Sequence, residues 1–215
     1  MRANEDELQE DMTIQAPAWI RSAVDEAENN PRLDALVDVV ARGASLVDHG
    51  RRAELLRGQW LGHALHPLLT DFPLGCWIGA GLLDLLGGRA ARNSAQRLVG
   101  LGLMAVPVTA GAGLADWSTI SDRRTRRVGA VHAIGNGMVG CAYLLSWRAR
   151  RRGAHHRGIG WGLLGAAGAW VTGYLGGHLS FARGVGSGLR GLELDAPVPD
   201  DSSEIRGPTV SGPGS

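Results

Sequence analysis

Four apolar segments of about twenty residues each fill the middle of the chain, with short polar stretches between them. They cover roughly residues 66–86, 97–116, 128–147 and 158–181. At a rise of about 1.5 Å per residue, a helix of this length crosses a hydrocarbon core of roughly 30 Å. Glycine is frequent in all four, which is unfavourable in soluble helices and common in membrane helices. The pattern therefore predicts an all-α integral membrane protein whose four spans form an up-down-up-down four-helix bundle.

Polar segments flank the apolar ones on both sides. Residues 15–57 show helical periodicity that is broken at Pro31 and the two asparagines before it, which predicts short amphipathic helices on or near the membrane surface. The acidic start of the chain and its end, rich in proline, glycine and serine, are both typical of disordered tails. The expected regions are an amphipathic N-terminal region at 1–57, a transmembrane domain at 58–186 and a tail at 187–215.

Tryptophan positions indicate the same segment ends. Trp60 and Trp117 flank the first and second segments on one side, and Trp147 and Trp161 flank the third and fourth on the other. Tryptophan is enriched at both membrane–water interfaces, so these four are expected to form two interfacial belts.

Small residues indicate how the helices pack. They recur every four positions along the fourth segment, at Gly165, Ala169, Gly173 and Gly177. A stripe of small side chains lets the backbone of a neighbouring helix approach closely, so this stripe is expected to be a helix contact.

Four histidines lie near the ends of the apolar segments. Alternating chain direction places all four on one side of the membrane, at His63, His66, His132 and His178. Asp71 lies five residues after His66, deeper in the first segment. Because a carboxylate at that depth is costly, Asp71 is expected to face the bundle interior and to find a partner there. This layer of imidazoles predicts a metal or haem site.

The layer allows three kinds of chemistry. Haem b needs two imidazoles from facing helices with small residues beside them, which His132 and His178 offer, with His66 as a substitute for either. Copper, zinc or iron would instead use three or four of the imidazoles, with Asp71 as an optional further ligand. His63 and His66 together fit such a compact cluster better than they fit haem. Without a cofactor, the same side chains would form a hydrogen-bond network or a path for protons or a small ligand. The sequence leaves these alternatives open.

Other function classes lack their motifs. The chain contains no hydrolytic triad, phosphate-binding loop or dinucleotide fingerprint, because its glycine pairs lie inside an apolar run and not at a strand-to-helix turn. Enzymatic activity is neither predicted nor excluded. The arginine run at 148–152 is expected to meet anionic lipid, and no nucleic-acid binding is expected.

Several long motifs occur in an order that resembles a known family. They are WLGHALHPLLTDFPLGCWIGAGLLDLLGG (60–88), AGLADW (112–117), RRVGAVHAIGN (126–136), SWRARRRG (146–153) and GYLGGHLSFARGVG (173–186). Over about residues 55–186 the chain is similar to the bacterial membrane family called domain-of-unknown-function family 2231. The resemblance implies a four-helix, multi-pass domain of the bacterial inner membrane, and it carries no ligand assignment.

Some members of that family continue into a C-terminal Rieske iron–sulfur domain, which implies redox work. The residues after Gly186 contain no Cys-x-His pair, so no Rieske domain is expected in this chain. The leading hypothesis is a redox-linked membrane subunit that contacts lipid and passes electrons to a protein partner, with homo-oligomer formation left open. The competing hypotheses are a non-catalytic membrane scaffold and a conductor of protons or a small ligand.

Overall fold

The chain is entirely helical in the part that the structure describes. This computed structural model describes residues 17–186, and the expected tails at 1–14 and 187–215 lie outside that range. The α-helices are α2 (Ala18–Asn29), α3 (Asp34–Ala44), α4 (Gly50–Leu56), α5 (Leu65–Leu86), α6 (Arg92–Ser118), α7 (Arg123–Arg151) and α8 (His155–Gly177). Short 3-10 helices occur at Pro31–Leu33 and Gln59–Leu61, and a π-helical turn at His178–Ala182 follows α8.

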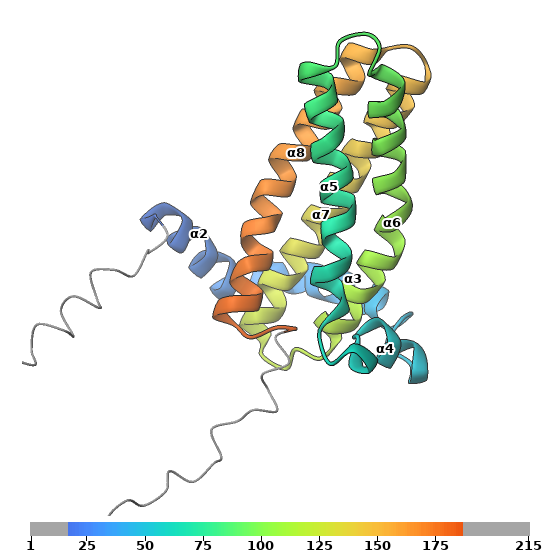
Figure 1. Ribbon diagram of the computed structural model, residues 1–215. Helices are drawn as coiled ribbons and strands as arrows, with labels where there is room; N and C mark the ends of the chain where they lie inside the picture. Colours follow the sequence, from blue (N-terminus) through green and yellow to red (C-terminus); the bar gives the residue numbers. More distant parts are fainter. Residues whose placement is uncertain (1–16, 187–215) are drawn as a thin grey trace, which may run out of the picture.

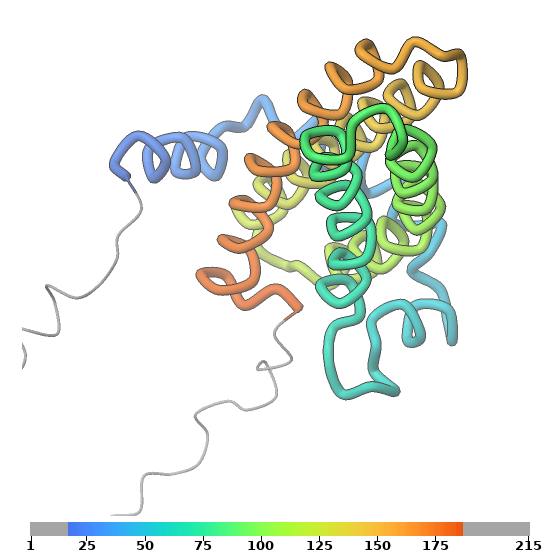
Figure 2. Tube along the Cα trace, turned by 45° about the horizontal axis from the view of Figure 1, so that its top comes forward, coloured from blue at the N-terminus to red at the C-terminus, as the bar shows by residue number. Residues whose placement is uncertain are grey.

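Four long helices, α5 to α8, lie side by side in both views (Figures 1 and 2). Helix α5 packs on α6 and α7 packs on α8, while contacts of α6 with α7 and of α5 with α8 join the two pairs. The connections at 87–91, 119–122 and 152–154 are short, so each helix returns beside the one before it. At the start of α7, the Asp122 side chain accepts hydrogen bonds from the backbone N–H groups of Arg124 and Thr125 and so caps the helix.

Three of the described helices are long enough and apolar enough to cross a membrane, namely α5, α6 and α7. The prediction of an all-α chain is therefore confirmed for the described residues, and three of the four expected spans are candidate membrane helices. Helix α8 has 23 residues but is rich in glycine, which keeps it out of this group.

The outer surfaces of all four long helices carry large apolar side chains. Leu85 of α5 is 80% exposed and Trp170 of α8 is 84% exposed. Met104 on α6 and Met138 on α7 are also exposed. Water-soluble monomers rarely expose so much apolar surface. The four helices therefore present a surface suited to lipid.

Aromatic stacking fills the centre of the helix group. The rings of Trp77 and Tyr143 stack with centroids 3.9 Å apart and planes 12° apart. A Cβ atom on Gly165 would lie 2.8 Å from the Tyr143 ring, so α8 approaches α7 this closely only with glycine there. The expected small-residue contact is confirmed at Gly165, whereas Gly173 of the same stripe has no such neighbour within 4 Å.

One interfacial tryptophan was predicted wrongly. Trp117 is buried, and its Nε1 donates a hydrogen bond to the Arg126 carbonyl at 3.2 Å. Val40 of α3 packs in the same cluster, because α3 covers this end of the long helices. Trp60, by contrast, is exposed as expected.

A buried ion pair joins the opposite end of the long helices. Arg150 of α7 donates two hydrogen bonds, of 2.8 and 2.5 Å, to the carboxylate of Asp84 on α5. The two side chains are only 2% and 8% exposed. Arg150 also donates to Ser146, whose hydroxyl donates to the Gly158 carbonyl of α8 at 2.6 Å. Within the arginine run at 148–152, Arg150 thus points inward and ties three helices together.

The expected amphipathic helices of residues 15–57 are present as α2, α3 and α4. They contact α6 and α7 at the end where α5 and α7 begin, which we call the histidine end (Figure 1). Asp34, at the start of α3, accepts a 2.8 Å hydrogen bond from Arg127 of α7. These contacts attach the N-terminal region to the long helices.

Glu28 is the second attachment point. It is 3% exposed, pairs with Arg183, and lies with its Oε1 atom 3.1 Å from Nε2 of His178. Burial acts to raise the pKa of Glu28, but the hydrogen bonds from Arg183 and His178 outweigh it and hold the pKa below its usual 4.5. Glu28 is therefore a charged anchor for α2 at neutral pH.

We predict that removing one partner of the Arg150–Asp84 pair destabilises the protein strongly. Arg150→Leu leaves the buried Asp84 carboxylate with only His155, whose Nε2 atom lies 3.3 Å from it, and loss of the guanidinium costs about 3–5 kcal/mol. Arg148→Leu is the matched control, because Arg148 is exposed. Chemical unfolding in detergent micelles measures the free energy of unfolding of both variants. Equal values would contradict a stabilising role of the buried Arg150–Asp84 pair.

We also predict that acid releases α2. Because the folded pKa of Glu28 lies below its unfolded value, the anchor's stability is fully present at neutral pH and is lost as the pH falls below about 4.5 through the folded pKa. Hydrogen exchange of the α2 amides, compared with those of α7, measures this release. In Glu28→Gln the α2 amides should exchange rapidly already at neutral pH; protection that persists in the variant argues against the anchor.

Candidate functional site

Two of the four predicted histidines come together between the long helices. The rings of His66, in the first turn of α5, and His132, on α7, lie edge to face with centroids 6.3 Å apart. Both side chains are half-buried. The two imidazoles come from facing helices, as the sequence analysis expected of a shared site.

Backbone carbonyls fix the orientation of both rings. His66 Nδ1 lies 2.9 Å from the Thr109 carbonyl oxygen of α6, and His132 Nδ1 lies 2.8 Å from that of Thr172 on α8. A carbonyl only accepts, so Nδ1 carries a proton in each ring, and in the neutral ring Nε2 keeps its lone pair. Histidines that bind metals usually donate their other N–H to a carbonyl or carboxylate in this way. The Asn136 amide donates to Nε2 of His132 at 2.9 Å.

Glycines on the neighbouring helices make room for the two rings. A Cβ atom on Gly113 would lie 2.9 Å from the His66 ring, and one on Gly176 would lie 2.9 Å from the His132 ring. Each glycine follows by four residues the threonine whose carbonyl binds the same ring. Each imidazole therefore rests on a Thr-x-x-x-Gly turn of the next helix.

The site is part of an internal repeat that relates α5 to α7. His132 follows His66 by 66 positions, and the same offset relates Tyr143 to Trp77 and Arg150 to Asp84. In all three cases the two related residues touch each other. Contacts between equivalent residues are the signature of a two-fold arrangement, in which such pairs lie on the axis.

A second offset relates α6 to α8. Thr172 and Gly176 follow Thr109 and Gly113 by 63 positions, and Gly165 follows Gly102 by the same number. Gly102 accommodates Trp77 as Gly165 accommodates Tyr143. The hairpins α5–α6 and α7–α8 are therefore two copies of one unit, and the histidine pair lies where the copies meet.

The other two histidines have different surroundings. His178 binds Glu28, so the structure pairs His132 with His66 and not with His178, the expected axial partner. His63 is exposed and lines a separate pocket. Among residues 17–186, no three or more His, Cys, Asp or Glu side chains form a group that could hold a metal ion. The expected compact cluster is therefore not assembled in this part of the chain.

Asp71 corrects another expectation. It is exposed on the outside of α5, between the exposed side chains of Leu68 and Phe72, and does not face the interior. Pro73, two residues later, is buried. Two residues turn a helix by roughly 200°, so burial of Pro73 directs Asp71 to the opposite face.

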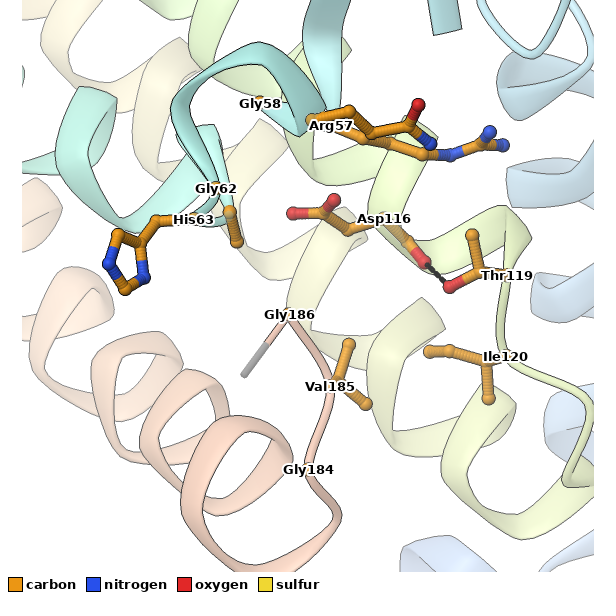
Figure 3. A pocket seen from close by; sticks show the side chains of 12 residues that line it. Arg57, Gly58, Gly62, His63, Asp116, Thr119, Ile120, Gly184, Val185 and Gly186 are labelled. Atoms are coloured by element: carbon orange, nitrogen blue, oxygen red, sulfur yellow. Dashed lines mark hydrogen bonds between the residues drawn. The ribbon is translucent and has the colours of Figure 1, made fainter. Parts of the chain in front are cut away.

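A pocket of about 470 Å³ opens at the histidine end, and neither His66 nor His132 is among its lining residues (Figure 3). It is lined by residues 57–59 and 62–64, by the end of α6 with the two residues that follow it, and by residues 184–186. The Asp116 carboxylate points into the pocket, whereas the His63 ring is turned away from that carboxylate (Figure 3). Arg57, also in the lining, pairs with Asp48 and donates to the Ala115 carbonyl at 3.0 Å.

The carbonyls of Thr109 and Thr172 were not predicted from the sequence, because residue type does not show where a backbone acceptor binds a side chain. The repeated Thr-x-x-x-Gly spacing is the signal that could have found them. With both Nδ1 atoms protonated, the pair offers two Nε2 lone pairs to one ion, or one lone pair and one hydrogen-bonded nitrogen to a polar network.

Comparison with known proteins supports the membrane assignment. A family model described as "Predicted membrane protein (DUF2231)" matches residues 62–188, which is more than half of the chain and includes all four long helices. No curated protein and no solved structure matches the chain. The chain belongs to this family of predicted membrane proteins, as its motifs implied.

Proposed function

We propose that all four long helices cross the bacterial inner membrane as an up-down-up-down bundle, and that His66 and His132 hold a redox-active metal centre between the two hairpins. The pair of Nδ1–H bonds to backbone carbonyls carries this proposal, because it leaves two Nε2 lone pairs on neighbouring rings. The centre would exchange electrons with a protein partner.

Helix α8 qualifies as the fourth span by its surroundings. With 23 residues it is roughly 34 Å long, enough for the hydrocarbon core. Leu163, Trp170 and Val171 face outward from it as the apolar side chains of α5 to α7 do. As the repeat equivalent of α6, which is apolar enough to span, α8 would lie at the same depth.

A single ion fits the packing better than a porphyrin does. Imidazole nitrogen suits copper, zinc and iron, of which copper and iron change oxidation state. Metal–nitrogen bonds of about 2.0–2.1 Å to both Nε2 atoms would place the ring centroids roughly 6 Å apart, close to the 6.3 Å of the pair. Haem b would use the same two nitrogens at a similar separation, but its ring would need space between the hairpins, where the two imidazoles lie edge to face.

One contact favours a second function, a structural hydrogen-bond network without metal. Asn136 donates to Nε2 of His132, the nitrogen that an ion would need. In that case the pair would only hold the two hairpins together. The two functions make opposite predictions for Asn136.

We predict that the protein purified in detergent binds a single copper or iron ion per chain and that His66→Ala and His132→Ala each abolish this binding. His156→Ala is the matched control, because His156 is exposed at the opposite end. Asp71→Asn should also leave metal content unchanged, since Asp71 faces outward. Elemental mass spectrometry and a visible spectrum measure the ion and detect haem by its Soret band.

Asn136→Leu separates the two functions. In a metal centre the variant frees Nε2 of His132 and binds the ion more tightly, whereas in a structural network it only removes a hydrogen bond worth about 1 kcal/mol. Titration with Cu²⁺ and unfolding of the metal-free variant give the two readouts. A folded, colourless protein that takes up no copper or iron would be inconsistent with the metal centre.

A further inference from the structure

The end of the long helices opposite the histidine end is rich in basic side chains, and we call it the arginine end (top of Figure 1). It comprises the last turns of α5 and α7, the connections at 87–91 and 152–154, and the first two turns of α6 and α8. These segments hold two histidines, one carboxylate (Asp84) and eight arginines, namely Arg89, Arg92, Arg97, Arg148, Arg150, Arg151, Arg152 and Arg157. The arginine end therefore carries a large excess of positive charge.

Both hairpins contribute to this surface. His155, the first residue of α8, lies with its Nε2 atom 3.3 Å from the carboxylate of Asp84 in the last turn of α5. The charge of Arg92, the first residue of α6, also acts on His155. The ends of α5, α6 and α8 are thus neighbours, and Arg150 of α7 joins them through its ion pair with Asp84. The arginines of the two connections therefore act on the same region of space.

Asp84 does not neutralise this charge. Its side chain is buried, and its oxygens already bind Arg150 and His155. The other seven arginines of the arginine end form no ion pair with any residue in the described range 17–186. Six of the seven, all except Arg92, are exposed. Their counter-charge therefore has to come from outside the described residues.

The arginines of the histidine end are used differently. Arg127 pairs with Asp34 and Arg183 pairs with Glu28, so these two attach the N-terminal helices. Helix α2, where the described range begins, and Gly186, where it ends, both lie toward the histidine end (Figure 1). A helix of 27 residues such as α6 is roughly 40 Å long, so the length of the bundle separates both chain ends from the arginine end.

The exposed arginines lie where the apolar outer surface ends. Leu85 and Leu86 are both largely exposed and come directly before the connection that carries Arg89. On α7, the guanidinium carbon of Arg151 lies 4.9 Å from the centroid of the Trp147 ring. Tryptophan is enriched at the level of the lipid headgroups, and a cation over its ring is attracted to it. The charge is therefore at the height where lipid phosphates lie.

We propose that the arginine end binds the headgroup of an anionic phospholipid through arginines of both hairpin connections. Arginine suits phosphate because its planar guanidinium offers paired N–H donors and a permanent charge. A zwitterionic phospholipid also has a phosphate, but its ammonium group would meet the same arginines. The surface therefore selects a lipid with net negative charge. The site is separate from the histidine pair and does not depend on a metal there.

The structure changes which arginines belong to this surface. The run at 148–152 does not act as a unit, because Arg150 faces inward and binds Asp84. Arg152 of the same run is exposed, and Arg89 of the other connection is exposed as well. Arg89 and Arg152 are therefore the pair to test, one from each hairpin.

The experiment measures how many molecules of phosphatidylglycerol and of phosphatidylcholine, with the same acyl chains, the protein binds in neutral detergent. Native mass spectrometry counts both lipids at equal concentration. The wild-type protein should prefer phosphatidylglycerol, and Arg89→Gln with Arg152→Gln should weaken its binding by roughly fivefold for each arginine. Arg32→Gln with Arg42→Gln removes two exposed arginines from the N-terminal helices and is the charge control, which should keep the wild-type preference.

A further arm adds glycerol phosphate, which has the phosphate without the acyl chains. It should not displace phosphatidylglycerol at equal concentration, and displacement would mean a site for a soluble phosphate instead of a lipid. Equal binding of the two lipids by the wild-type protein would refute the lipid site. So would an equal loss of binding in the control variant, because the effect would then follow from total charge. None of these results depends on whether the histidine pair holds a metal.

Discussion

Inside a bilayer a polar group must find its partner within the protein, and this constraint shapes the helix group described here. His66 and His132 each donate to a carbonyl of the next helix, and Arg150 neutralises Asp84 across the group. Because apolar side chains pack as well on lipid as on each other, such contacts and close glycine packing determine which helix faces which. The histidine–carbonyl contact occurs once in each hairpin and the Arg150–Asp84 pair joins the two hairpins, which gives the group its two-fold character.

Hydropathy predicted the apolar segments well and the helix ends poorly. The third segment was expected at 128–147, but α7 runs from Arg123 to Arg151. The extra turns are arginine-rich, because a helix continues past the hydrocarbon wherever a cap such as Asp122 and solvated side chains support it. Apolar pattern marks the lipid boundary, and capping marks the helix boundary.

The candidate site could be predicted only in part. Alternating chain direction brings His66 and His132 to one end, which counting alone establishes, but the rotation of each helix does not follow from counting. Asp71 faces outward because Pro73 faces inward. His178 binds Glu28, a residue 150 positions away in the sequence, and not the other histidines. A partner so distant in the chain gives no local signal. The repeated Thr-x-x-x-Gly spacing is a local signal, but a hydropathy pattern does not reveal it.

The central claim is that the rings of His66 and His132 carry their protons on Nδ1 and offer Nε2 to one shared ion. Nitrogen NMR of the protein with ¹⁵N-labelled histidine, recorded before and after addition of Cu⁺, tests it most directly. The account predicts two neutral rings protonated on Nδ1, and only their Nε2 signals shift when the metal is added. His66→Ala and His132→Ala should each remove one of these two signals. Unshifted Nε2 signals, or shifts at His63 and His178 instead, would contradict it.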